Sequence, residues 1–224
     1  MRVLAVETST LAGGVALLDG ESVRGEYLLD VRTTHSERLM SAIDRVLGDA
    51  GWSARDLQGL AVAIGPGSFT GLRIGLSTVK GLALALGLPV APVPTLDAMA
   101  ASLPWAALPV CPVIDARKGE VYTCLYRWDG ARMRREWEYL AIAPGELARR
   151  LAEPAILLGN GAAAIRSPLA RLAPPPHRSP SPASVGYLGL ERLRAGETVT
   201  AADLAPLYLR PSEAELKRRA VPVR

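Results

Sequence analysis

Short apolar runs separated by tight turns open the chain and predict β-strands. Runs at residues 2–6, 15–20 and 21–31 are joined by short connections at glycine and aspartate, and strands joined in this way must be antiparallel. A continuous apolar run at 60–64 lacks polar alternation, which indicates a strand buried on both faces. A shorter run at 90–93 predicts a further strand.

Helical spacing appears between these runs. Thr34 and Glu37 have the spacing of a capping box, and apolar residues then recur every three or four positions to about residue 50. A second helix is expected from about Thr70 to Leu86, closed by a Gly-Leu-Pro stop, and Thr95 is expected to cap a third helix. The first half therefore has the predicted order β-β-β-α-β-α-β-α.

The second half begins like the first, with an apolar strand, an acidic residue and a returning strand. The expected strands are 110–115, 120–128, 133–140, 155–158 and 206–210, and the expected helices are 144–152 and 183–196. This similarity predicts two duplicated lobes, 1–103 and 104–224, which meet near 103–109. A cleft between two such lobes would have Glu7 and Asp115 at its mouth.

Composition narrows the class of protein. Apolar residues make up 49% of the chain and aromatic residues only 5%, with a single phenylalanine, so the core is expected to consist of Ala, Val, Leu and Ile. The formal net charge of +4 is concentrated near the C-terminus, without the dense basic patch and interleaved aromatics of proteins that bind RNA alone. No apolar run reaches the length of a membrane span, and no signal sequence is recognised. The expected location is therefore cytoplasmic, with no membrane partner.

A glycine-rich loop, AIGPGSFTGLRIG at 63–75, lies between a buried strand and a helix. Free amides and the helix dipole at such a position favour an anion, although neither a P-loop nor a dinucleotide-binding pattern is present. The alternative is a tight turn, in which glycine permits unusual backbone angles and Ser68 or Thr70 caps the helix. Gly71 and Gly75 share one helix face, which predicts close approach of another backbone, from this chain or from a second one.

Few residues are available for catalysis. His35 and His177 are the only histidines, and their surroundings match neither a zinc site nor a Ser-His-Asp triad. Glu7 and Asp115 follow strands and would hold Mg²⁺ on a nucleotide, or else serve as turn and cap residues. The two cysteines do not make a disulfide framework. They are expected to be free thiols that pack as small apolar residues and face each other across a hairpin.

Five segments together resemble the TsaB (YeaZ) family. They are LAVETST, GPGSFTGLRIG, PVPTLDAMA, VIDARKGEVY and PLYLR, in order and in register over nearly the whole chain. The resemblance implies an α/β fold of two duplicated RNase H-like lobes, as in actin, Hsp70 and sugar kinases. It also implies a non-catalytic subunit that supports the TsaD transferase, together with the ATPase TsaE, in forming threonylcarbamoyladenosine at position 37 of tRNA.

The resemblance also implies which residues form the sites. The helix that starts HSERLMSA has one histidine where catalytic relatives have a metal-binding pair, so no metal and no resident cofactor are expected, and ATP or ADP with Mg²⁺ would bind only weakly, at the complex. The residues expected to bind TsaD, or a second copy when TsaD is absent, are His35, Leu39, Ile43, Val46, Gly71, Gly75, Thr78, Val79 and Leu82. A vestigial nucleotide cleft is expected at Glu7, Thr8, Ser9, Gly65, Gly67, Ser68, Asp115, Gly159 and Asn160.

Two other functions stay open at this point. An ATP-binding phosphotransferase or ATPase would use Glu7, Asp115 and the glycine loops. A direct tRNA-binding module would use the basic residues of the tail, which are Lys217, Arg218, Arg219 and Arg224. Otherwise tRNA is expected to meet this chain only through the complex.

Overall fold

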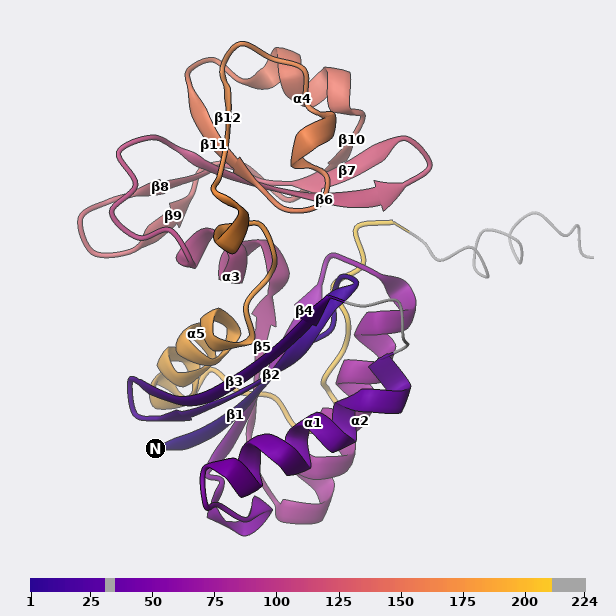
Figure 1. Cartoon of the computed structure of the whole chain (residues 1–224), viewed down its shortest axis with the longest axis vertical. Coiled ribbons are helices and arrows are strands. Elements are labelled where there is room, and N and C mark those ends of the chain that lie inside the picture. Colours follow the sequence, from indigo (N-terminus) through magenta and orange to yellow (C-terminus); the bar gives the residue numbers. More distant parts are fainter. Residues whose placement is uncertain (31–34, 211–224) are drawn as a thin grey trace, which may run out of the picture.

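The chain folds into two lobes, one above the other in Figure 1. The computed structural model describes residues 1–30 and 35–210, without the side chains of 35–37. The expected capping box at Thr34 and the basic tail therefore lie outside the described residues.

The first lobe is built on a five-stranded sheet in the order β3-β2-β1-β4-β5. Its strands are β1 (Arg2–Glu7), β2 (Ala12–Asp19), β3 (Ser22–Asp30), β4 (Gly59–Gly65) and β5 (Val90–Pro94). The first three are antiparallel neighbours, and β4 and β5 run parallel to β1. The element order predicted for this half is confirmed.

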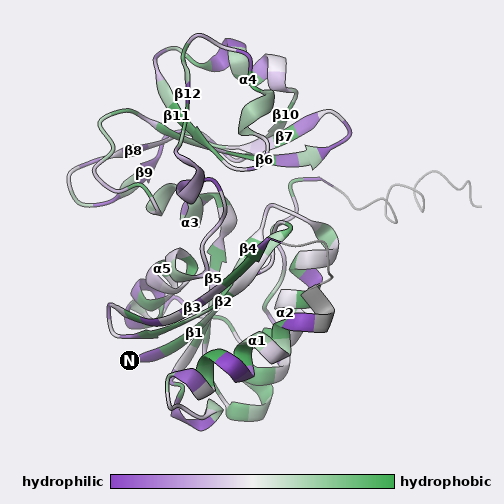
Figure 2. Ribbon diagram, viewed as in Figure 1, coloured by the Kyte–Doolittle hydropathy of each residue, from purple (hydrophilic) through white to green (hydrophobic). Residues whose placement is uncertain are grey.

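Helices cover both faces of this sheet. On one face lie α1 (His35–Asp49) and α2 (Phe69–Leu86), and on the other lies α5 (Pro182–Ala195). The central strand β1 is apolar from Val3 to Val6 because both of its faces are buried: Leu4 and Val6 join the α1–α2 core, whereas Val3 and Ala5 join the α5 core. Figure 2 shows this sheet as largely hydrophobic ribbon.

The position of α5 corrects the predicted domain boundary. The chain returns to the first lobe after the second is complete, so residues 182–195 do not belong to a C-terminal lobe. Two glycines permit the close packing of α5, since a Cβ at Gly186 would overlap Leu18 and one at Gly189 would overlap Ala61. Helical periodicity predicted α5 as an element, but not which sheet it covers.

The second lobe repeats the strand order of the first. Its strands are β6 (Val110–Arg117), β7 (Glu120–Thr123), β8 (Tyr126–Trp128), β9 (Met133–Arg135), β10 (Leu140–Ile142), β11 (Ala155–Leu158) and β12 (Ala170–Leu172). The order β10-β7-β6-β11-β12 places the first strand in the centre, as in β3-β2-β1-β4-β5, and β8–β9 forms a hairpin beside it. The duplication is therefore confirmed.

The helices of the second lobe are short. They are α4 (Pro144–Arg150) and the 3-10 turns η2 (Ala162–Ala164) and η3 (Pro175–His177). The helix α3 (Thr95–Ala101) leads from the first lobe to the second, and η1 (Ala54–Asp56) precedes β4. Asp97 of α3 accepts hydrogen bonds from Tyr126 and Tyr139 at 2.6 and 2.7 Å, which fixes α3 against the second lobe.

Five local expectations are wrong. The strand expected at 120–128 is divided into β7 and β8, with residues 124 and 125 in neither. The segment expected as a strand at 133–140 holds β9 and only the first residue of β10, and no strand forms at 206–210. Thr95 is the first residue of α3 instead of its cap. Cys111 and Cys124 do not face each other, because they lie in cores on opposite sides of the second sheet. Successive residues of a strand point to opposite faces of the sheet.

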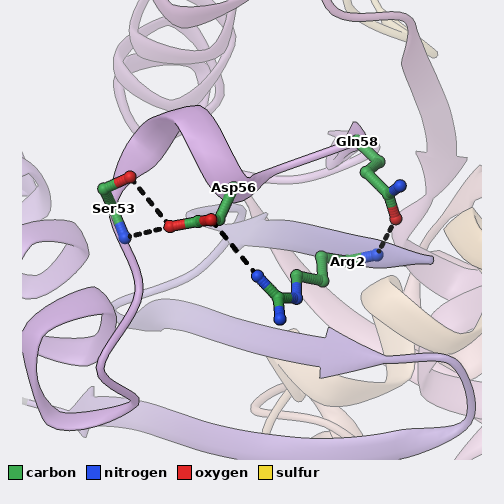
Figure 3. A network of polar contacts seen from close by, with 4 residues as sticks. All are labelled: Arg2, Ser53, Asp56 and Gln58. Atoms are coloured by element: carbon green, nitrogen blue, oxygen red, sulfur yellow. Dashed lines mark hydrogen bonds and ion pairs between the residues drawn. The ribbon is translucent and has the colours of Figure 1, made fainter.

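The amino end of β1 is fixed by a polar network shown in Figure 3. The Arg2 guanidinium lies 3.3 Å from Asp56 Oδ1, and the Arg2 amide donates to Gln58 at 2.8 Å. Asp56 also accepts from Ser53, as in a capping box. These contacts connect β1 to the segment that leads into β4, at the end of the sheet opposite Glu7.

By length and composition, α2 is the one described helix that could cross a membrane. Its buried stripe of Leu72, Leu76, Val79 and Ala83 belongs to the core of the first lobe. We therefore interpret it as a core helix.

Candidate functional site

The candidate site lies where the central strands end. In the first lobe, β1 ends at Glu7 and β4 ends at Gly65; in the second lobe, Asp115 stands near the end of β6 and Gly159 follows β11. Ligands of open α/β sheets bind outside the carboxyl ends of the strands. The duplicated order thus places the predicted acidic residues at equivalent positions.

Glu7 is fully buried instead of standing at an open mouth. Its Oε1 accepts a hydrogen bond from the Ser9 amide at 2.5 Å, while Oε2 has no partner among the described residues. Burial raises the pKa of Glu7 to about 7, against the lowering effect of the bonds from Ser9. A carboxyl group in this environment carries only part of its charge near neutral pH.

The glycine loop forms a tight turn packed on this segment. The Ser68 amide donates to Ser9 O at 2.6 Å, and a Cβ at Gly67 would overlap Ser9. Ser68 Oγ accepts from the Gly71 amide at 3.2 Å, so Ser68 is the cap of α2. The amides of Ser68 and Gly71 are therefore used within the chain, which favours the tight-turn alternative.

Residues 204–210, here termed the C-terminal strap, cross the end of β4. The Leu207 amide donates to Ile64 O at 2.7 Å, and Leu207 O lies 2.8 Å from the place of a Cβ on Gly65. Gly65 has a φ of +113°, which an L side chain rarely adopts. The strap therefore packs against the start of the glycine loop, at Gly65.

The strap continues to the second lobe. Tyr208 stacks on Phe69 of α2 with ring centroids 4.9 Å apart. Arg210 forms an ion pair with Glu120 and donates to Ala116 O at 3.0 Å. Sequence analysis identified the PLYLR segment but assigned it to a strand. The sequence did hold a signal for a connection between the lobes. The segment lacks strand alternation, and it carries a tyrosine and a terminal arginine.

Asp115, like Glu7, accepts a hydrogen bond from the amide two residues later, but it differs from Glu7 in exposure and in having a cationic partner. Its side chain is 42% exposed and lies 3.4 Å from the Arg117 guanidinium. Its Oδ1 accepts from the Arg117 amide at 2.8 Å, and its own amide donates to Asn160 at 2.9 Å. This is the arrangement of a turn residue.

Gly159 and Asn160 have local structural roles. Gly159 has a φ of +108° and no room for a Cβ against Val113 O, and the Asn160 side chain holds Asp115 in place. Over residues 1–30 and 38–210, no group of three or more His, Cys, Asp or Glu side chains is placed to bind a metal ion.

The predicted partner residues are mostly inside the first lobe. Ile43, Val46 and Val79 are at most 2% exposed and belong to its core, so a partner would not reach them in this conformation. A Cβ at Gly75 would overlap Thr8 Oγ1. The close neighbour that was predicted for the helix face of Gly71 and Gly75 is therefore, at Gly75, the turn after β1 of the same chain.

The remaining predicted partner residues vary in accessibility. Leu39 and Gly71 are buried, Thr78 and Leu82 are half-buried, and the side chain of His35 lies outside the described residues. Exposed apolar side chains on the same helices were missed: Met40 of α1 is 47% exposed and Leu84 of α2 is 75% exposed. The sequence signal for both was an apolar residue placed away from the buried stripe of its helix.

Comparison with known proteins identifies the family. The family model described as TsaD, tRNA N6-adenosine threonylcarbamoyltransferase, matches residues 30–217. A Bacillus subtilis (strain 168) protein named tRNA threonylcarbamoyladenosine biosynthesis protein TsaB is 31% identical over 227 residues, which cover 97% of each chain.

Solved structures agree. YeaZ from Pseudomonas aeruginosa superposes with a TM-score of 0.83 at 30% identity, over 93% of this chain and 99% of that one. The activator of 2-hydroxyisocaproyl-CoA dehydratase from Clostridium difficile has a TM-score of 0.50 at 7% identity, over 93% of this chain and 100% of that one, a likeness of fold alone. The expected α/β fold of two lobes with one repeated strand order is confirmed. On the match over nearly its full length, this chain belongs to the TsaB (YeaZ) family.

Proposed function

We propose that this chain is a non-catalytic, cytoplasmic subunit of the machinery that forms N6-threonylcarbamoyladenosine at position 37 of tRNA. Its partners would be a TsaD-like transferase and a TsaE-like ATPase, and a second copy of the chain when the transferase is absent. The tRNA modification itself is the process for which the Bacillus subtilis relative is named.

One observation carries the non-catalytic role: the place where a kinase-like fold does its chemistry is filled by this chain's own groups. Glu7 is buried and accepts a hydrogen bond from the Ser9 amide, Asp115 is paired with Arg117, and the amides of Ser68 and Gly71 in the glycine loop are bonded within the chain. Two carboxylates in these states do not form a clamp for Mg²⁺ on a nucleotide.

The proposed partner surface is the outer side of α1 and α2. These helices lie side by side on the outer face of the first lobe in Figure 1. Met40 and Leu84 leave apolar area in water there, and a shallow hollow lined in part by Tyr27, Leu29 and Ala42 opens beside α1. A specific interface needs roughly 1,000 Å² of buried surface, and two helices of this length offer enough area for it.

Reconstitution tests the proposal. Threonylcarbamoyl transfer to tRNA is measured with the transferase and the ATPase, with and without this chain. We expect transfer to depend on the chain and the chain alone to give none. Transfer from threonylcarbamoyl-AMP to tRNA by the purified chain would refute the non-catalytic role.

The surface is tested with two variants and a matched control. Leu84→Asp and Met40→Asp are expected to weaken co-elution with the transferase at least tenfold. Val23→Asp changes an apolar residue of β3 whose exposure, 51%, lies between those of Met40 and Leu84, and it should leave assembly intact. Normal co-elution of both helix variants would place the interface elsewhere.

The enzyme alternative has its own test. Calorimetry with Mg-ATP is expected to give no heat of tight binding, because Glu7 is buried and the Ser68 and Gly71 amides of the glycine loop are already bonded within the chain. Tight binding that is lost in Glu7→Ala would favour an ATPase or phosphotransferase instead.

A further inference from the structure

Arg73 is exposed near the start of α2, and two aromatic rings hold its guanidinium group in place. The guanidinium carbon lies 3.9 Å from the ring centroid of Phe69. Its Nε donates a hydrogen bond to the Tyr208 hydroxyl oxygen at 3.4 Å, and Tyr208 of the C-terminal strap stacks on Phe69 in turn. An arginine that is ordered in this way loses less conformational freedom when it binds a ligand.

This ordered arginine has no carboxylate partner in the described part of the chain. Its two terminal nitrogens make no hydrogen bond or ion pair within residues 1–30 and 38–210. Other arginines are paired with acidic residues, as are Arg2 with Asp56, Arg127 with Glu136 and Glu153, Arg134 with Asp129 and Arg194 with Glu21. The guanidinium group of Arg73 therefore presents two parallel N–H groups that suit a carboxylate from another molecule.

The charge of α2 lies in one stripe of the helix. Arg73 and Lys80 are the only charged residues among its 18, and both are basic. They are seven positions apart and Leu84 follows four positions later, so the three side chains share one face. Lys80, like Arg73, has no ion pair with the described residues, and Leu84 is 75% exposed. The face is therefore positive along its first half and apolar near its end.

From these observations we propose that the face of α2 formed by Arg73, Lys80 and Leu84 binds an acidic segment of the transferase. A carboxylate of that segment accepts two parallel hydrogen bonds from the Arg73 guanidinium, a second acidic residue lies near Lys80, and an apolar residue covers Leu84. Charge-assisted pairs of this kind are stronger than neutral hydrogen bonds, and they fix the register of an interface. The inference rests on the proposed function and adds the chemistry by which the partner is recognised.

An acidic protein segment is favoured over RNA and over a second copy of this chain. Binding to phosphates uses many basic groups, whereas α2 provides two of them beside an exposed leucine. The Phe69 ring is already engaged by Tyr208 and Arg73, which makes it a poor platform for an unpaired base. Pairing of α2 with its equivalent in a second copy would bring basic side chains together without a carboxylate from either helix.

Charge reversal tests the inference. Binding of the full chain to the transferase is measured by calorimetric titration at low and high salt. We expect Arg73→Glu to weaken binding at least about tenfold and Lys80→Glu about threefold. Arg73→Lys keeps the charge but loses the planar fork, so it should weaken binding about threefold. Binding of the original chain should weaken as salt rises, and Arg73→Ala should show a smaller dependence on salt.

The matched control is Arg150→Glu. Arg150 is also an exposed arginine that stacks on an aromatic ring, 4.8 Å from the Trp137 centroid, but it belongs to α4 of the second lobe. Its reversal should leave binding unchanged, and melting curves must show that both reversed variants are folded. Unchanged binding in folded Arg73→Glu overturns the inference. Equal losses in the two variants also overturn it, because net charge alone would then explain the effect.

A second experiment identifies the carboxylate. Transferase variants, each with one surface Asp or Glu changed to Lys, are tested for recovery of binding to Arg73→Glu. Recovery in one variant supports the pairing, and no recovery at any acidic position overturns it. Loss of self-association or of tRNA binding in Arg73→Glu, with transferase binding intact, overturns it in favour of a second copy or of RNA. If Leu84→Asp prevents co-elution and Arg73→Glu does not, the proposed partner surface stands and this inference alone fails.

Discussion

The strand ends of the two lobes hold their acidic residues in opposite states. Glu7 of the first lobe has no exposed surface, and one of its oxygens has no partner within residues 1–30 and 38–210. Asp115 of the second lobe is 42% exposed and bound to Arg117. Duplication of the strand order has thus preserved where the acidic residue stands but not its environment. Equivalent positions in a duplicated fold do not imply equivalent chemistry, and here neither position retains a free carboxylate.

The largest predicted effect concerns the packing that keeps the first strand end closed. Gly75→Leu is expected to destabilise the protein by about 3 kcal/mol, because a side chain there would displace Thr8 and the turn after β1. Urea unfolding measures the change. Gly81→Ala on the same helix is the matched control: nothing lies within 4 Å of a Cβ there, so it should stabilise by up to about 1 kcal/mol. Equal unfolding curves for the two variants would contradict the internal packing of Gly75.

The burial of Glu7 predicts a dependence of stability on pH. Its pKa is about 7 in the folded protein and 4.5 when exposed, so between these values the folded state binds more protons and stability falls as pH rises. Glu7→Gln removes this loss. We expect the variant and the original to be similar at pH 4.5 and the variant to be more stable by roughly 2 to 3 kcal/mol at pH 8. A stability difference that stays constant from pH 4.5 to 8 would mean that the carboxyl group is not buried as described.

The strap joins the two strand ends, and its contribution is expected to be smaller. Arg210→Ala removes the ion pair with Glu120 and the bond to Ala116 O, for a loss of about 1 kcal/mol from a half-buried pair. A double-mutant cycle with Glu120→Gln measures the coupling. Arg194→Ala, whose partner Glu21 is 72% exposed, should change stability by much less. Equal losses from Arg210→Ala and Arg194→Ala would show that the strap is not fixed to the second lobe.

The smallest effect is expected at the exposed acidic residue. Asp115→Asn retains an oxygen for the Arg117 amide and removes only a solvent-exposed ion pair, so the free energy of unfolding should change by less than about 0.5 kcal/mol. Thermal melting at low and high salt measures this. A loss of stability comparable to that of Gly75→Leu would contradict the difference in environment between the two strand ends.

The sequence was sufficient to predict the elements of the first lobe and the duplication. Buried strands such as β4 have continuous apolar runs, and α2 has a periodic stripe with a serine cap and a glycine stop, and both signals are local. The residue that packs against Gly75 was not predictable in the same way. Gly75 requires a close neighbour, but that neighbour, Thr8, is far away in sequence, and only the pairing of β1 with β4 brings it near.

The chemistry of the candidate site was predicted less well than its location. Acidic residues after β1 and in β6 are readily found, whereas the burial of Glu7 and the pairing of Asp115 depend on surrounding atoms. The 206–210 segment shows the same limit. Its short apolar composition matched a strand. In the structure it makes one backbone hydrogen bond to Ile64 and a ring stack on Phe69 instead of pairing along a strand.

The return of α5 to the first sheet has a consequence for how the protein is made. Because α5 covers Ala5, Ala61 and Ala91, the first sheet stays open on one side until the ribosome has released residue 195. The second lobe lies between these two parts of the sequence, so it can fold before the first lobe is complete. The protein is in this sense an insertion of one lobe into another, and a single cut between the lobes would leave the amino-terminal fragment without half of its cover.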